Sequence, residues 1–292
     1  MGLNQKIGSN EFVVLAELDP PKGVDVSNMT LDATRVKGMV DAFLVPELST
    51  AVMRMSALGA AVILEREGME TIMQVNCRDR NRLALQADLL AAYACGIRNL
   101  MPVVGEDPKI GDHTETKPVY DVDIFELLQT IGSLEGGRDM AGVELAGSPT
   151  FFVGAQVNAG LDDPDIEAEI ERVTQMSANG SRYFVTTPVF DLEPLKRLRD
   201  RVGHLNAPII PTVLLLKSAG MARYMDSHMA HVHIPADLIQ RIQKAPDKVL
   251  ECVRIAAELI HAIQDQGFGG VLISTMGWED KLPDIIHAKE AL

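Results

Sequence analysis

The chain has 292 residues, of which 47% are hydrophobic, and its formal net charge is −14. This composition excludes a disordered chain and disfavours nucleic acid or an anionic membrane as a partner. No apolar run approaches the roughly 20 residues that span a bilayer, and the first residues lack the apolar core of a signal peptide, so we expect a cytoplasmic protein.

Short apolar runs typical of buried strands recur along the chain, at residues 12–17, 42–45, 71–76, 98–104, 151–157, 182–186, 208–214 and 270–274. Segments with helical periodicity lie between them, most clearly at 79–96, 163–180 and 246–267. In the first of these helices we predict an apolar stripe that ends before Gly96 and comprises Leu83, Leu85, Leu89, Leu90, Tyr93 and Ala94.

Eight strands that alternate with helices predict an α/β protein with a (β/α)8 TIM barrel, a single domain over residues 1–292. A doubly wound parallel sheet is the main alternative, and the lack of a GxGxxG motif after the first strand argues against it. The polar segment 105–123 follows the fourth strand and is too long for a simple connection. Long loops in this position form the active sites of barrel enzymes.

In a barrel, the C-terminal ends of the strands meet around one pocket. Glu17 ends the first apolar run, directly before Leu18 and the helix-breaking Asp19-Pro20-Pro21. A carboxyl group that shares a cleft with other acids has a raised pKa, which suits a general acid. From the residues alone, a solvated acid at the rim is an equally good interpretation. The other residues at the predicted strand ends are Pro46, Glu47, Gln74, Asn76, Gly105, Glu106, Gln156, Asn158, Thr186, Thr187, Ser274 and Thr275.

We predict no metal site. The segment SHMAHVH carries His228, His231 and His233 without a matching acid, and we interpret these as surface or core histidines. The three cysteines, Cys77, Cys95 and Cys252, are too few and too dispersed for a disulfide framework or a metal cluster.

Several segments occur in an order that is similar to a known family: ELDPP, RMSALGAA, CRDRNRLALQADLLAAYACGIRN, GEDPKIGDH, KPVYDVD, FFVGAQVN, TTPVFD and LKSAGMARYM. Over nearly its whole length the chain resembles the methylenetetrahydrofolate reductases, in the short bacterial form that consists of the flavin-binding barrel alone. The long CRDRNR block is the most specific of these segments, and so many segments in order indicate homology.

The resemblance implies a barrel that binds FAD at the strand ends and passes a hydride through it to methylenetetrahydrofolate, giving methyltetrahydrofolate. The electron donor would be NAD(P)H or a partner protein. Glu17 matches the family's acid at the end of the first strand, which protonates the folate, and Glu106 matches an acid between flavin and substrate. By the same resemblance Thr187, Glu106 and Gln156 bind substrate, and the cofactor-binding residues are Gln74, Asn76, Gly105, Tyr120, Asp121 and Asn158.

Several positions depart from the family pattern. Glu106 stands where the family usually has Asp, Thr187 where it has Gln, and Pro46 where it has Thr. Gln74 and Asn76 replace the usual His and Thr of the third strand. An Arg-Lys pair near the FAD phosphates is replaced by Gln175-Met176, which removes two cations that a pyrophosphate would prefer.

Our leading hypothesis is a reductase of C1-folate metabolism that binds a tetrahydrofolate-type carrier and FAD and forms an oligomer. An electron-transfer subunit is a candidate partner. A first alternative is a reductase that works without flavin or acts on another C1 carrier. A second is a non-catalytic subunit that binds a pterin or a partner within a larger complex.

Overall fold

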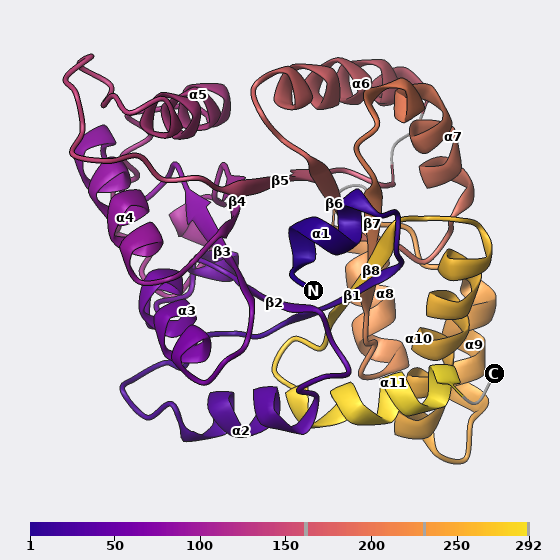
Figure 1. Ribbon diagram of the computed structural model, residues 1–292. Helices are drawn as coiled ribbons and strands as arrows, with labels where there is room; N and C mark the ends of the chain where they lie inside the picture. Colours follow the sequence, from indigo (N-terminus) through magenta and orange to yellow (C-terminus); the bar gives the residue numbers. More distant parts are fainter. Residues whose placement is uncertain (161–162, 230–231, 291–292) are drawn as a thin grey trace.

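The computed structural model describes residues 1–160, 163–229 and 232–290, and it shows a closed barrel of eight parallel strands inside a ring of helices (Figure 1). Each strand pairs with the next in the chain, and β1 closes the barrel against β8. The predicted (β/α)8 barrel is therefore confirmed, and every predicted strand lies within two residues of its observed bounds. The strands are β1 (Val13–Glu17), β2 (Ala42–Val45), β3 (Thr71–Asn76), β4 (Asn99–Val103), β5 (Phe152–Val157), β6 (Tyr183–Pro188), β7 (Ile209–Leu214) and β8 (Gly270–Ser274).

One main helix follows each of the first six strands, three helices connect β7 to β8, and α11 follows β8. Short 3-10 turns occur at Ser49–Ala51, Pro108–Ile110, Gly203–Leu205 and Glu279–Lys281. The α-helices are α1 (Leu3–Gly8), α2 (Ser27–Arg35), α3 (Ala57–Arg66), α4 (Arg82–Ala94), α5 (Ile124–Glu135), α6 (Asp163–Ala178), α7 (Glu193–Val202), α8 (Ala219–His228), α9 (Ala236–Lys244), α10 (Lys248–Asp265) and α11 (Leu282–Glu290).

The barrel interior is filled with side chains from the strands and from α1, which lies across the N-terminal opening (Figure 1). Leu3 and Ile7 of α1 join this interior cluster, and the backbone N–H of Leu3 donates to the Glu70 carboxylate at 2.9 Å. Tyr183 is fully buried in the same cluster, where a Cβ on Gly154 would lie 2.4 Å from its ring. Helix α1 closes the barrel interior at this end, and a separate cavity of about 700 Å³ lies beside it, between α1 and α7. Barrel enzymes bind their substrates at the other, C-terminal end.

Helix α4 differs in part from its predicted apolar stripe. Its buried residues are Leu85, Leu89 and Ala92, whereas Leu83 is 75% exposed and Leu90 37% exposed. The predicted stripe was too wide because a helix of a barrel packs one face on the sheet, and positions 85, 89 and 92 share that face. The end of the helix is as predicted, since Gly96 has a φ of +106°, in the left-handed region.

The loops that follow β2 and β4 contact each other at the C-terminal end of the barrel. The backbone N–H of Met53, after β2, donates to Asp112, after β4, at 3.0 Å. At Gly111 a Cβ would lie 1.8 Å from the carbonyl oxygen of Ala51, so the two loops touch through backbone. This contact fixes the β4 loop, and with it Gly105 and Glu106, over the barrel.

Candidate active site

A cavity of about 510 Å³ opens at the C-terminal end of the barrel, above the ends of β1 to β5. Its position is the one in which barrel enzymes place their active sites. The lining combines three glutamates, two arginines and several amides with apolar side chains. The lining residues are Glu17, Pro46, Glu47, Leu48, Ser49, Gln74, Arg78, Pro102, Val103, Val104, Gly105, Glu106, Ile124, Gln156, Asn158, Arg172 and Met176.

Glu17 is the last residue of β1, is partly buried and lines the cavity. Burial raises the pKa of its carboxyl group to about 7, and the charges of Asp19 and Glu279 act in the same direction. The hydroxyl of Ser274, at the end of β8, donates to Oε1 of Glu17 at 2.7 Å and opposes this shift. Near neutral pH the neutral acid and the carboxylate are therefore both populated, as a proton donor requires.

Two further acids, Asp19 and Glu279, act on Glu17 through their charges. Burial raises the pKa of Asp19, while the positive charges of Arg54 and Lys217 lower it, and Arg54 lies 3.4 Å from the Asp19 carboxylate. Burial also raises the pKa of Glu279, which lies in the 3-10 turn after β8. The surroundings of Glu17 are thus acidic, which favours its protonated form.

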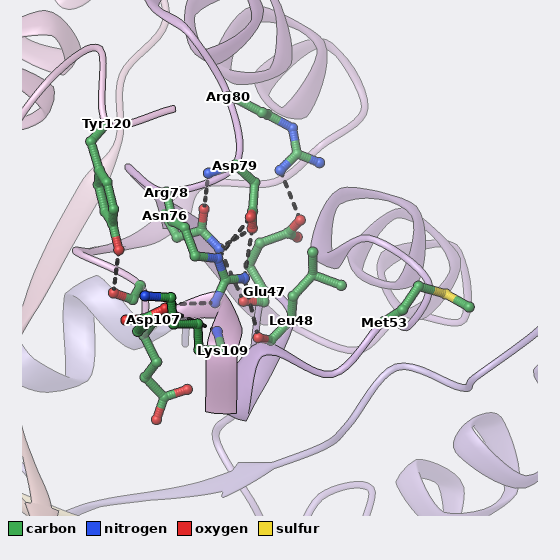
Figure 2. A network of polar contacts seen from close by, with 12 residues as sticks. Glu47, Leu48, Met53, Asn76, Arg78, Asp79, Arg80, Asp107, Lys109 and Tyr120 are labelled. Carbon is green, nitrogen blue, oxygen red and sulfur yellow. Dashed lines mark hydrogen bonds and ion pairs between the residues drawn. The ribbon is translucent and has the colours of Figure 1, made fainter. Parts of the chain in front are cut away.

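Arg78, just after β3, is the centre of the polar network shown in Figure 2. Its side chain is 3% exposed and donates to both carboxylate oxygens of Asp79, at 2.7 and 2.8 Å, and to the backbone carbonyl of Glu106 at 3.0 Å. Burial alone would raise the pKa of Asp79, but hydrogen bonds from Arg78 and Asn76 bring it below its usual value. The arginine thereby ties the β3 and β4 loops together.

Glu47, just after β2, is buried and fully paired. Arg80 donates to its Oε1 at 2.8 Å, and the backbone N–H of Ala57 donates to its Oε2 at 2.6 Å (Figure 2 shows the contact with Arg80). Its own backbone N–H donates to the Gln74 side-chain carbonyl at 3.1 Å. Glu47 therefore holds the first turn of α3 and the end of β3, and each of its carboxylate oxygens already accepts a hydrogen bond.

Arg172 lines the opposite wall from helix α6. Its Nε–H donates to Oε2 of Glu169 at 2.9 Å, a second N–H contacts Oε1 of the same carboxylate, and a third donates to the Gln156 backbone carbonyl at 2.9 Å. Met176 lies one turn further along α6 and is buried against the cavity. This wall thus carries a cation, but one that a carboxylate already neutralises.

Of the residues predicted from the sequence, the cavity brings together Glu17, Gln74, Gly105, Glu106, Gln156 and Asn158. Neither Glu106 nor Gln156 makes a side-chain hydrogen bond within the described residues, and both side chains are exposed. Asn158 donates its backbone N–H to Glu169 at 2.8 Å. The side chains of Glu106 and Gln156 could therefore contact a ligand without first breaking a hydrogen bond within the described residues.

The remaining predicted site residues lie outside the cavity lining. Asn76 is buried below it and donates to the Glu47 carbonyl at 3.2 Å and to Asp79 at 2.7 Å. Tyr120 donates to the Gly105 carbonyl at 3.2 Å, and Asp121 pairs with Arg82 on the surface, at 3.0 Å. The Thr187 hydroxyl accepts the backbone N–H of Ala159 at 3.1 Å. In this structure these four residues support the loops around the cavity.

Sequence reasoning missed Arg78, Arg172 and Ser274. Arg172 had a detectable signal, since it precedes Met176 by four residues, one helical turn, and so shares its face of α6. Ser274 stands at a predicted strand end, but the sequence does not indicate its partner, because Glu17 is 257 residues away in the chain.

No three His, Cys, Asp or Glu side chains are arranged to hold a metal ion in residues 1–160, 163–229 and 232–290. His228 contacts the Tyr224 carbonyl at 2.9 Å and His233 lies 3.1 Å from Asp226, while His231 lies outside the described residues. Within those same ranges, no helix is both long and apolar enough to cross a membrane.

The chain matches the sequence model of a known protein family over nearly its whole length. The sequence model of the family "Methylenetetrahydrofolate reductase" matches residues 2–290. Among curated proteins, methylenetetrahydrofolate reductase 2 of Schizosaccharomyces pombe is 24% identical over 285 residues, which cover 92% of this chain and 43% of the yeast protein. The chain thus spans less than half the length of that relative.

Two solved structures share the barrel at low sequence identity. An uncharacterized protein from Clostridium thermocellum that binds two copies of 5-methyl-5,6,7,8-tetrahydrofolic acid superposes with a TM-score of 0.68 at 15% identity, covering 99% of this chain and 98% of the other. A 2,3-dimethylmalate lyase of the PEP mutase/isocitrate lyase superfamily gives 0.54 at 10% identity, covering 99% and 86%. These likenesses show the fold.

Proposed function

Because the chain belongs to the methylenetetrahydrofolate reductase family, we propose that it is a cytoplasmic oxidoreductase of C1-folate metabolism that interconverts methylene- and methyltetrahydrofolate. The carrier would bind in the cavity at the C-terminal end of the barrel. The ligand named for the Clostridium thermocellum protein, a methyltetrahydrofolate, supports this class of carrier.

The observation that carries the proposal is the state of Glu17. The carboxyl group lines the cavity with a pKa raised to about 7. We propose that its neutral form donates a proton to the folate nitrogen that leaves the methylene carbon. The O–H bond breaks, an N–H bond forms, and the electron pair of the cleaved C–N bond stays on that nitrogen. The iminium that remains is the electrophile a hydride needs.

Other lining residues would bind and orient the pterin. The amides of Gln74, Gln156 and Asn158 offer donors and acceptors for a flat heterocycle. Glu17 and Glu47 both accept hydrogen bonds, so Glu106 is the lining acid whose carboxylate has no hydrogen-bond partner among the described residues. Thr187 would act from behind this layer, through Ala159, and contact the substrate only if its hydroxyl exchanged partners.

FAD, the cofactor that family membership suggests, fits this lining only in part. The amides suit the flavin ring, which FAD would use to relay hydride. Its pyrophosphate needs cations or free N–H donors, and the guanidinium groups of both Arg78 and Arg172 already donate to carboxylates and carbonyls. The residues present therefore do not fit the pyrophosphate, and no step of the proposed reaction is assigned to FAD.

This mismatch favours the alternative of a reductase that works without FAD, with electrons from NAD(P)H or from a partner subunit. A non-catalytic pterin- or partner-binding subunit is the third candidate. If the chain is such a subunit, Glu17→Gln should leave ligand binding and complex assembly unaffected, and the wild-type protein should show no turnover.

The test is a turnover assay of the purified protein with methylene- or methyltetrahydrofolate and with NADH, NADPH or an artificial electron carrier, with and without added FAD. Turnover that falls by about 10²-fold in Glu17→Gln would support the proposal. A protein that binds methyltetrahydrofolate but turns over with no donor or acceptor would overturn it in favour of the binding subunit.

A further inference from the structure

Glu17 and Ser274 face each other across the seam where the barrel closes. β1 pairs with β8 in the register Ala16 to Ile273, so the last residues of the two strands lie side by side. Ser274 is 4% exposed, and its backbone carbonyl accepts the N–H of Leu215 at 2.8 Å. The backbone of Ser274 is therefore held in the sheet, and its hydroxyl donates to Oε1 of Glu17 at 2.7 Å.

The two oxygens of the Glu17 carboxyl group are not equivalent. Oε1 accepts from Ser274, whereas Oε2 has no protein partner among the described residues. In a neutral carboxylic acid the carbonyl oxygen is the stronger hydrogen-bond acceptor, so a donor to Oε1 favours the tautomer that carries the proton on Oε2. The acid can thus hand over its proton from Oε2 without losing the contact with Ser274.

We propose that Ser274 is the positioning residue of the general acid, an inference that rests on the proposed function. Its hydroxyl keeps the transferable proton on Oε2 and stabilises the carboxylate that remains after transfer. When Oε2–H protonates the folate nitrogen, Glu17 becomes an anion. The hydrogen bond from Ser274 then becomes charge-assisted and stronger. Ser274 thereby assists proton release in one direction and holds the acceptor in the other.

The charged groups around Glu17 do not stabilise its carboxylate in this way. Asp19 and Glu279 carry negative charge and favour the protonated acid, and Arg54 and Lys217 act on Asp19. Within the described residues, Ser274 is the hydrogen-bond donor that acts directly on the Glu17 carboxyl group. Removing its hydroxyl should therefore leave the acid harder to ionise.

The neighbouring residue provides a matched control. Thr275 is 1% exposed and its Oγ1 has no hydrogen-bond partner within the described residues. Thr275→Val removes a buried hydroxyl one position along the same chain without touching the Glu17 contact. Ser274→Ala and Thr275→Val thus differ in whether the lost hydroxyl served Glu17.

The experiment is infrared titration of the protonated carboxyl band, which is assigned to Glu17 by its loss in Glu17→Gln. We expect Ser274→Ala to move the band to higher frequency and its titration midpoint upward by about one pH unit, a typical effect of losing one hydrogen bond to a charged group. Ser274→Thr should restore the wild-type midpoint, and Thr275→Val should leave it unchanged.

The same variants should be followed by the pH profile of turnover. In Ser274→Ala the limb that reports Glu17 should move with the infrared midpoint while KM changes little. An unchanged band and midpoint in Ser274→Ala would overturn the inference. A shifted band in a protein that turns over no folate would support the pairing of Ser274 with Glu17 and overturn the proposed function instead, so the two failures are distinct.

Discussion

Glu169 and Arg172 lie one turn apart on α6, and the carboxylate takes up both the Nε–H and a terminal N–H of the guanidinium group. Glu169 is 5% exposed and also accepts the backbone N–H of Asn158 at 2.8 Å. One carboxylate therefore neutralises the cation on this wall of the cavity and orders the end of β5.

This pairing predicts the effect of Glu169→Gln on cofactor affinity. The amide can still accept from Asn158, but it no longer neutralises Arg172, so the cavity gains one positive charge. We expect wild-type protein to bind FAD weakly and Glu169→Gln to bind it on the order of 10-fold more tightly, the equivalent of about 1.4 kcal/mol. Flavin fluorescence quenching measures both affinities.

Glu171→Gln is the control, because it makes the same charge change on the exposed side of α6. Equal gains in the two variants would mean that net charge, and not the release of Arg172, sets the affinity. A wild-type protein that purifies yellow, with one FAD per chain, would refute the mismatch inferred for the pyrophosphate.

The raised pKa of Glu17 predicts the pH dependence of turnover. In the direction of methylenetetrahydrofolate reduction the acid must be protonated, so the rate should be constant at low pH and fall as pH rises through about 7. Glu17→Gln should lose about 10²-fold in kcat and lose this limb of the profile. A limb that persists in Glu17→Gln would assign it to another group.

The same group makes folding stability depend on pH. Its pKa is about 7 in the folded protein, against an ordinary value of 4.5 for a glutamate, so the folded state binds the proton more tightly. Below pH 4.5 both states are protonated and there is no penalty. Between pH 4.5 and 7 the free energy of unfolding falls as pH rises, by up to about 3 kcal/mol from this residue.

Glu17→Gln lacks this penalty and should be more stable than wild type at pH 8 but not at pH 4.5, as measured by urea denaturation. Glu115→Gln, at an exposed loop position, is the control and should show no such difference. If the two variants respond alike to pH, Glu17 is ordinarily solvated, which was the other interpretation of the sequence.

Gly105 should tolerate no side chain. Its φ is +86°, and a Cβ there would lie 2.8 Å from Cβ of Arg78. Gly142 has a similar φ of +81° but an added Cβ would meet nothing within 4 Å. We expect Gly142→Ala to cost about 1 kcal/mol of unfolding free energy from backbone strain alone, and Gly105→Ala to cost about 1–3 kcal/mol more and to weaken folate binding.

Thermal melting and folate titration of the two alanine variants measure this difference. Similar losses in both would show that the β4 loop can move away from Arg78, and that Gly105 is required only for its backbone conformation.

The fold was predictable because its signal is local. The runs at 42–45, 71–76 and 270–274 coincide with β2, β3 and β8, since buried parallel strands are short, continuous apolar segments. The width of the α4 stripe was not predictable in the same way, because Leu83 and Leu90 are apolar yet exposed. Which face of a helix is covered depends on its neighbours.

The sequence predicted which residues lie around the candidate site better than it predicted their hydrogen-bond partners. Strand order alone placed Glu17, Gln74, Glu106 and Gln156 around one cavity. The pairing of Arg172 with Glu169 is local to a helix, but its position against the cavity depends on how α6 packs. The support of Gly105 by Tyr120 depends on the path of a long loop that no periodicity describes.

The seam between β1 and β8 joins two segments that lie far apart in the sequence. Glu17 and Ser274 are separated by 257 residues, yet a single hydrogen bond connects them. Without β8, the Glu17 carboxyl group would lack the hydroxyl that donates to it. The proposed proton donor is therefore complete only when both strands of the seam are in place.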